Sequence, residues 1–269
     1  MLFDLQIVLL PTSFILGACV GSFINVVVYR LPLGISIIYP PSRCPSCQTR
    51  LTPRDNIPIL GWLILRGKCR YCGAPISWRY PTVELLVALL FLALVWRFGA
   101  ELGLASLLLL GAFIAWLTTL ALIDIDTETL PNSLTQSGLI LGICYHALLS
   151  TSPQTLAQNL IASTIGIVLG IWSLSLLGVT ATIFLGKEAM GGGDPKLLGM
   201  IGAWLGWQAV LVTTLIAALL GVTLAGIGKL LGRSVQRIRF GPCLALGGLG
   251  ALFWGQYLTE QYLRWFFFG

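Results

Sequence analysis

Long apolar runs separated by short polar segments dominate the chain. A helix needs about 20 apolar residues to cross the hydrocarbon core of a bilayer. The pattern predicts an all-α polytopic membrane protein with about eight transmembrane helices, and the sixth run is the shortest. The runs cover residues 5–28, 83–96, 102–123, 134–149, 156–185, 197–207, 210–231 and 242–258.

Composition supports this class and argues against a nucleic-acid partner. Hydrophobic residues make up 57% of the chain and charged residues only 10%, whereas soluble domains carry about 25% charged residues. The formal net charge is +6, and the basic residues lie at the ends of apolar runs. We therefore expect the lipid bilayer, and no nucleic acid, as a partner. Asp4 and the lack of a basic N-terminal region indicate a first span, not a cleaved signal.

Basic residues also predict the orientation of the helices. Cytoplasmic loops carry an excess of Lys and Arg. With eight spans, one set of loops contains only Arg97 and Arg264, so we expect it, and both termini, to face outward. The other set holds fourteen basic residues and should be cytoplasmic: Arg30, Arg43, Arg50, Arg54, Arg66, Lys68, Arg70, Arg79, Lys187, Lys196, Lys229, Arg233, Arg237 and Arg239.

One sizeable polar segment interrupts the apolar pattern. We predict three parts: a first transmembrane segment at residues 1–29, a cytoplasmic loop domain at 30–81 and a transmembrane core at 82–269. No linker, low-complexity segment or internal repeat is evident. Gly166 and Gly170, and the glycines of residues 247–250, are spaced for close helix packing in lipid.

The loop domain carries two Cys-x-x-Cys pairs separated by 21 residues. This spacing is typical of tetrahedral thiolate coordination of Zn²⁺, and nearby cations such as Arg43 and Arg70 would favour thiolates. Redox dithiols or disulfides are the alternative, and a cytoplasmic location argues against stable disulfides. Four cysteine ligands leave no open coordination position, so we expect a structural zinc site: Cys44, Cys47, Cys69 and Cys72.

Two acidic loops flank apolar runs on the predicted cytoplasmic side. Asp124 ends the third run, and Asp194 follows Gly191, Gly192 and Gly193. An ionisable group next to the membrane core is costly and indicates function. The alternatives are a solvated turn for Asp124 and a helix N-cap for Asp194. We interpret both as an aspartyl protease pair, because two adjacent carboxyl groups share one proton and supply a base and an acid.

Other catalytic classes have little support. The single histidine, His146, lies in an apolar run away from any Ser or Cys motif, so we interpret it as a packed or interfacial residue. No His-Glu-x-x-His zinc-protease motif is present.

Four motifs together resemble the bifunctional type IV prepilin peptidases, or leader peptidase/N-methyltransferases. They are Gly21-Ser-Phe-Ile-Asn-Val-Val-Val-Tyr-Arg-Leu-Pro32, the paired Cys-x-x-Cys loop, Ile123-Asp-Ile-Asp with Leu130-Pro131, and residues 188–197, Glu-Ala-Met-Gly-Gly-Gly-Asp-Pro-Lys-Leu. They follow the family's order and cover nearly the whole chain. Two departures leave the aspartate pair intact: Asn132, where many relatives have Asp, and Pro195, where a small or β-branched residue is frequent.

The resemblance implies a multi-pass enzyme of the bacterial inner membrane with its active site facing the cytoplasm. It implies cleavage of the basic leader of type IV prepilins and pseudopilins, with Asp124 and Asp194 as catalytic residues. It further implies N-methylation of the new terminal residue, usually Phe, from S-adenosylmethionine, and zinc on the four cysteines. No sequence motif marks the S-adenosylmethionine site; the stretch 21–32 and the cysteine loop, including Arg66-Gly67-Lys68, are the candidate places.

Two other functions remain open at this point. One is a non-enzymatic transporter or assembly factor with a zinc-stabilised loop, in which the two aspartates would lie apart. The other is an intramembrane protease of the presenilin type, which also uses Gly-x-Gly-Asp. The cysteine loop and residues 21–32 favour the prepilin branch.

Overall fold

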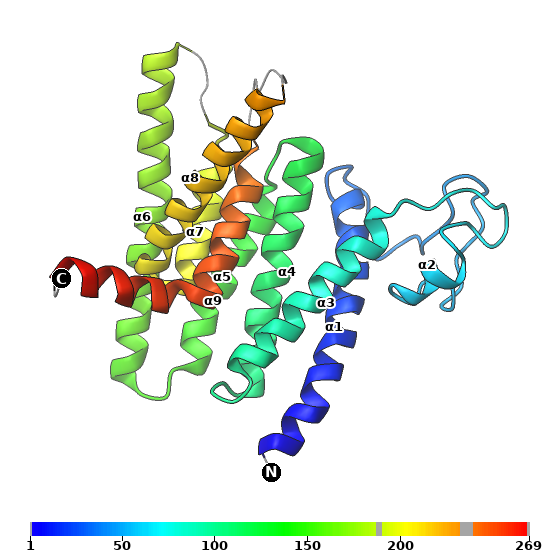
Figure 1. The fold of residues 1–269 in the computed structure, drawn as a ribbon, viewed down its shortest axis with the longest axis horizontal. Helices are drawn as coiled ribbons and strands as arrows, with labels where there is room; N and C mark the ends of the chain where they lie inside the picture. Colours follow the sequence, from blue (N-terminus) through cyan, green and yellow to red (C-terminus); the bar gives the residue numbers. More distant parts are fainter. Residues whose placement is uncertain (1, 187–189, 232–238, 268–269) are drawn as a thin grey trace. The chain divides into compact units, whose positions relative to one another are not determined.

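The computed structural model describes residues 2–186, 190–231 and 239–267. These residues contain nine helices. Lys187, Glu188, Arg233 and Arg237 lie outside these ranges. No strand is present in the described ranges, and the prediction of an all-α protein is confirmed. The helices are α1 (Leu2–Arg30), α2 (Leu60–Ile64), α3 (Arg79–Phe98), α4 (Leu104–Thr127), α5 (Asn132–Leu149), α6 (Pro153–Leu185), α7 (Asp194–Leu205), α8 (Trp207–Leu230) and α9 (Phe240–Phe267) (Figure 1).

Five of these helices are long and apolar enough to cross a membrane. They include Val8–Arg30, Arg79–Phe98, Leu104–Thr127, Pro153–Phe184 and Trp207–Leu230. The predicted count of about eight is not confirmed, because the remaining runs fall in α5, α7 and α9. The twelve residues of α7 span about 18 Å at 1.5 Å per residue, less than the roughly 30 Å of a hydrocarbon core.

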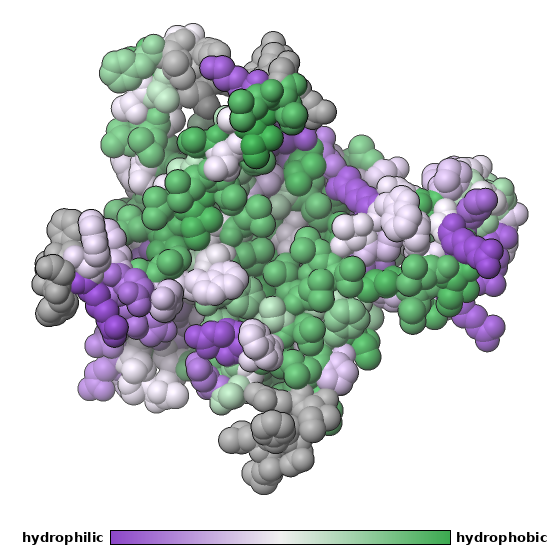
Figure 2. All heavy atoms as spheres, viewed as in Figure 1, coloured by the Kyte–Doolittle hydropathy of each residue, from purple (hydrophilic) through white to green (hydrophobic). Residues whose placement is uncertain are grey.

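The outer surfaces of the long helices are apolar. On α6, the exposed fractions of Ile183 and Phe184 are 73% and 88%, and on α8 that of Val222 is 72%. Figure 2 shows hydrophobic residues covering much of the helical surface on the face in view. Apolar surface on this scale in a helical protein is suited to contact with lipid.

The chain divides into two compact units, residues 1–119 and 120–269, with the boundary inside α4. In the first unit, α1 packs along α3. A Cβ atom at Gly17 would lie 2.8 Å from the Cα atom of Ala88, and one at Gly21 would lie 2.7 Å from the Cα atom of Glu84. These two glycines let the backbones approach closely. The predicted division at residues 29 and 81 stays a prediction.

In the second unit, α7 is the buried centre and contacts α5, α6, α8 and α9 (Figure 1). A Cβ atom at Gly166 of α6 would lie 2.5 Å from the carbonyl oxygen of Gly202, and one at Gly170 would lie 2.8 Å from the backbone of Gly199. The predicted close packing through these glycines is confirmed. Trp204 also donates a hydrogen bond to the Gly138 carbonyl at 2.7 Å, so α7 is held from two sides.

Candidate active site and metal centre

Asp124 and Asp194 lie at helix ends in the second unit. Asp124 is in the last turn of α4, Asp194 is the first residue of α7, and each is 7% exposed. Pro195 favours a helix start here, because its fixed backbone angle suits the first turn. Gly193, not Asp194, is the N-cap residue, and no side chain makes a capping hydrogen bond. The interpretation of Asp194 as a simple N-cap is therefore wrong. The solvated-turn interpretation of Asp124 is also wrong, since the side chain is buried.

The loops that carry the two aspartates meet. A Cβ atom at Gly193 would lie 2.7 Å from the Cβ atom of Leu130, so only glycine permits this approach. Lys196 at the start of α7 donates a hydrogen bond of 2.7 Å to the side-chain oxygen of Asn132 at the start of α5. Asn132 thus provides a neutral acceptor for Lys196. These contacts join the two loops whose aspartates are 70 residues apart in sequence.

The electrostatics of the pair favour a shared proton. Asp194 lies outside the five candidate spans. Burial, and next the nearby Asp124 carboxylate, raise the pKa of Asp194 to about 7, although the Gly191 backbone N–H opposes this rise. Both carboxylates also interact electrostatically with the buried Cys243 thiol of α9. The side chains of Asp124 and Asp194 therefore occupy one buried neighbourhood, in which one carboxyl group can hold a proton while the other is charged.

The start of α9 contributes contacts that the sequence analysis missed. The backbone N–H of Gly241 donates a hydrogen bond to Asp124. Arg239 pairs with Glu128, just after α4, at 3.2 Å. One sequence feature could have indicated these contacts. Gly241-Pro242 begins an apolar run on the same predicted side of the membrane as both aspartate loops.

The four predicted metal ligands cluster in the first unit. Their sulfur atoms all lie within 4.8 Å of one another, and the sulfurs of Cys44 and Cys72 are 3.7 Å apart. A tetrahedron with metal–sulfur bonds of about 2.3 Å has sulfur–sulfur edges of about 3.8 Å. The residues therefore fit a tetrahedral metal ion such as Zn²⁺.

The two Cys-x-x-Cys segments have the same backbone design. The N–H of Cys44 bonds to the Thr49 carbonyl, and the N–H of Cys69 bonds to the Ala74 carbonyl. The residue after each second cysteine, Gln48 or Gly73, has a positive φ of 58° or 71°. The loop thus contains a short structural repeat that the sequence analysis did not detect.

Backbone N–H groups supply the electrostatic support for the thiolates. Those of Cys47 and Ser46 lower the pKa of Cys44, and those of Cys72 and Tyr71 lower the pKa of Cys69.

Arg70, beside the second cysteine pair, binds an acidic residue of the same loop. Its Nε atom pairs with Asp55 at 2.6 Å. Asp55 also accepts hydrogen bonds from the Thr52 hydroxyl at 2.7 Å and from the Thr52 backbone. These contacts, those with Thr52 first, lower the pKa of Asp55 to about 2. Asp55 therefore ties the second cysteine pair to the preceding turn.

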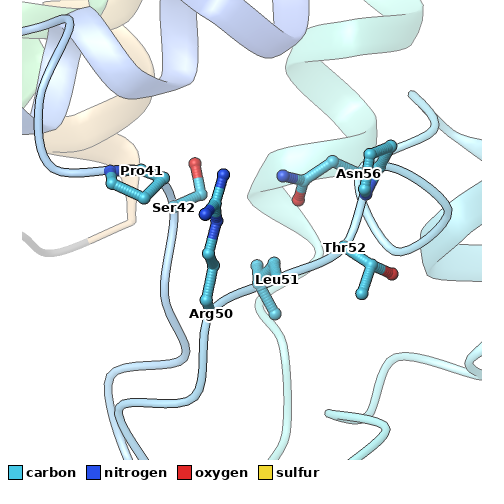
Figure 3. Close-up of a pocket in the computed structure, with 7 residues that line it drawn as sticks. Pro41, Ser42, Arg50, Leu51, Thr52 and Asn56 are labelled. Carbon is cyan, nitrogen blue, oxygen red and sulfur yellow. The ribbon is translucent and has the colours of Figure 1, made fainter.

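An open pocket of about 430 Å³ lies in the same loop (Figure 3). Leu51, Pro41 and Pro53 supply apolar walls, and Arg50, Asn56, Ser42 and Thr52 supply polar groups. Its volume falls in the range of small-molecule sites.

His146 is in the last turn of α5, at the opposite end from Asn132. Its ring lies edge-on to Tyr145 with a centroid distance of 5.0 Å. Because α5 has 18 residues, His146 is roughly 20 Å along the helix from the aspartate loops. This position supports its interpretation as a packed residue.

Comparison with known proteins gives consistent matches. Residues 15–98 match the model of the Bacterial Peptidase A24 N-terminal domain, and residues 111–226 match that of the Type IV leader peptidase family. The chain is similar to a prepilin leader peptidase/N-methyltransferase of Dickeya chrysanthemi, with 40% identity over 87% of this chain and 88% of the relative. Similar proteins of the same name occur in Stutzerimonas stutzeri (37% identity; 94% and 93% covered) and Aeromonas hydrophila (38%; 93% and 92%). No solved structure matches the chain significantly.

Proposed function

Because the chain belongs to the type IV leader peptidase family, we propose that it is a multi-pass inner-membrane aspartyl endopeptidase and N-methyltransferase. It removes the leader peptide from type IV prepilins and N-methylates the new N-terminal residue, usually Phe. Pseudopilins are substrates of the same kind, and nucleic acid is not a partner. The active site faces the cytoplasm, in agreement with the fourteen basic residues that the sequence predicts on that side.

The peptidase proposal is supported by two buried carboxyl groups from distant loops that lie near enough to interact electrostatically. In the proposed reaction, ionised Asp124 takes a proton from a water molecule, and the oxygen attacks the scissile carbonyl carbon. Asp194, protonated near neutral pH, donates its proton to the leaving nitrogen as the C–N bond breaks. The products are a carboxyl group on the leader and a free amine on the pilin.

The position of the pair at helix ends suits a substrate whose basic leader precedes an apolar helix. That helix lies in lipid, and the scissile bond lies at the membrane surface. Glu128 and Asp126 are exposed carboxylates after Asp124, and we assign them to attraction of the basic leader. Glu188, which we place in the same role, lies outside the described residues.

We assign the four-cysteine cluster to a structural Zn²⁺ ion. When bound, the ion would be held by Cys44, Cys47, Cys69 and Cys72, and it would cross-link the two cysteine segments. A loop with few buried apolar residues gains much of its folding free energy in this way. Purified protein should contain one zinc per chain.

We assign the open pocket of the cysteine loop that Arg50 lines to the methyl donor, S-adenosylmethionine. The Arg50 guanidinium suits the carboxylate of its amino-acid part, and Leu51 and the two prolines suit its apolar parts. Arg50→Ala should then abolish methylation and leave leader cleavage intact. Loss of both reactions, or of neither, would contradict the assignment.

The test of the function is N-terminal mass analysis of a prepilin incubated with the protein, with and without S-adenosylmethionine. Wild-type protein should release the leader in both cases and add one methyl group only with the donor. Asp124→Asn and Asp194→Asn should each reduce cleavage by at least about 10³-fold, the order expected when one member of a catalytic unit is lost. Glu260→Gln, at an exposed carboxylate of α9, is the matched control and should cleave normally. Cleavage by either aspartate variant at the control rate would remove that residue from the pair.

A further inference from the structure

The start of α9 lies beyond residues 111–226, which match the leader peptidase family model, yet it reaches Asp124. On the premise of the proposed peptidase function, we propose that Gly241 and the preceding Arg239 form a positioning element that holds Asp124 in its catalytic orientation. Gly241 does so with its backbone N–H and by lacking a Cβ atom. Arg239 does so with its charge and its pair to Glu128.

Gly241 is in direct contact with the carboxylate. A Cβ atom at this position would lie 2.6 Å from Oδ2 of Asp124 and 2.9 Å from Cγ, closer than carbon atoms and carboxylate atoms approach. Both residues are buried, so the Asp124 side chain has little space into which it could move. Only glycine lets the first turn of α9 donate to this carboxylate.

The residues at the start of α9 explain why the Gly241 N–H bonds to Asp124. The first four N–H groups of a helix have no partner within it, and the partial positive charge of the helix start attracts anions. Pro242 has no N–H, so the preceding N–H, that of Gly241, carries the interaction with the carboxylate.

Arg239 supports the same arrangement. Its guanidinium interacts electrostatically with Asp124. It also pairs with Glu128 through Nη2 at 3.2 Å and Nε at 3.4 Å. Glu128 has a positive φ of 56°, so the chain turns sharply after α4 at the residue that Arg239 binds. The ion pair therefore ties the start of α9 to the turn that follows Asp124.

This arrangement gives the two aspartates different surroundings. Burial disfavours the charged form of Asp124, and the Gly241 N–H and the Arg239 cation oppose this effect. Asp194 is buried beside that charge and retains its proton to about neutral pH. The start of α9 therefore assigns the base to Asp124 and the acid to Asp194.

The decisive variant is Gly241→Ala, with Gly255→Ala as its control. Gly255 is in the same helix, and a Cβ atom there would make only an ordinary contact of 3.7 Å with Ala251. Gly241→Ala should lower kcat for leader cleavage about 10²-fold, the scale expected for a misplacement of about 1 Å, with KM within twofold of wild type. The acidic limb of the pH–rate profile should also move to higher pH. Gly255→Ala should match wild type in all three readouts.

Methylation of a synthetic peptide that already has a free N-terminal Phe reports whether the variant is folded, and it should be unchanged. If Gly241→Ala does not insert into the membrane, the Arg239→Gln variant provides the test. It leaves the backbone intact and should move the acidic limb of the pH–rate profile to higher pH as well. Unchanged cleavage and an unchanged pH profile in the inserted variant would overturn the inference. If Asp124→Asn is inactive in the same assay, the proposed function stands; if Asp124→Asn also cleaves, the function itself is wrong.

Discussion

The cysteine loop and the aspartate site hold their functional groups in opposite ways. In the loop, four thiols lie within 4.8 Å, and Asp55 binds Arg70 and Thr52 through short polar contacts. At the aspartate site, the loops are brought together by packed helices and by glycines that let side chains of another segment approach the backbone closely, as Leu130 does at Gly193 and Asp124 does at Gly241. The loop is held together by contacts between side chains. The aspartate site is held together by helices and loops that pack closely at glycines.

This difference determines what breaks each region. A loop with few buried apolar residues loses its structure when a cross-link is removed, because little else opposes chain entropy. A packed helical site tolerates loss of a surface contact and fails when volume is added where none is free.

Removal of the metal should have the largest effect. Structural zinc in small domains supplies on the order of 10 kcal/mol of folding free energy. Cys69→Ser, or a strong chelator, should therefore unfold residues 42–76 and abolish methylation. Hydrogen exchange of the loop and zinc content are the measurements.

Leader cleavage should survive this treatment, because the aspartates are in the other compact unit. Cys144→Ser, at an exposed cysteine of α5, is the control and should keep one zinc per chain. Full loop protection without zinc would show that the cysteines are not the main cross-link.

The cysteine site was predictable because its signal is local. Two Cys-x-x-Cys pairs bring their own geometry, and the four thiols in the structure lie within 4.8 Å of one another. The all-helical class was predictable for a similar reason, since long apolar runs admit few other structures in lipid. Hydropathy did not distinguish a span from a buried helix, so α7 appeared among the predicted spans although it is a short helix buried in protein.

Added volume between α6 and α7 should have the next largest effect. Gly202→Val should destabilise the second unit by about 1–3 kcal/mol, the usual cost of overpacking, because its side chain would meet the backbone of Gly166. Asp194 begins the same helix, so cleavage should also fall. Thermal unfolding in detergent and the cleavage assay measure the two effects.

Gly226→Val, on α8, is the matched control because no atom lies within 4 Å of a Cβ atom there. It should be neutral in both assays. Equal melting temperatures for the Gly202 and Gly226 variants would mean that the α6–α7 contact is not tight.

The pH dependence tests the state of the aspartate pair. The pKa of Asp194 is about 7 in the folded protein, raised from an ordinary value of 3.8 by burial and by Asp124. Asp194 donates a proton in the proposed reaction, so cleavage should fall about tenfold per pH unit above pH 7. The folded state binds more protons than the unfolded chain between about pH 4 and 7, so stability should decrease as pH rises through this window.

A pH–rate profile together with thermal unfolding at several pH values would check both signs. A rate that stays flat to pH 9 would rule out Asp194 as the acid. Rising stability between pH 4 and 7 would show that this group does not dominate proton linkage.

The contacts around the aspartates were less predictable, because each depends on the tertiary structure. Gly241 and Asp124 are 117 positions apart in sequence, and nothing local shows that a Cβ atom is excluded there. The sequence does show glycines before Asp194, and it was reasonable to infer close approach at that loop. It does not show which backbone approaches, and Leu130 and the start of α9 become visible only after the helices are packed.

The smallest effect should come from the Asp55–Arg70 pair. The side chain of Arg70 is half exposed and that of Asp55 is 2% exposed. Because solvent screens the guanidinium, we expect the pair to contribute about 1 kcal/mol. Asp55→Asn should therefore weaken zinc retention about fivefold in a competition assay with a chelator at pH 7. At this pH the wild-type contribution is fully present, because Asp55, with its pKa lowered to about 2, loses its charge only in strong acid.

Glu101→Gln removes a second carboxylate of the first unit that pairs with an arginine, and there the side chains of Arg97 and Glu101 are 48% and 66% exposed. It should leave zinc retention unchanged, because this pair stabilises no contact of the cysteine segments. A loss much greater than fivefold in Asp55→Asn would mean that Asp55 acts as a required cross-link of the loop. Equal zinc retention in the two variants would mean that the metal alone fixes the second cysteine pair. The thiols would then be the only side chains that cross-link the loop.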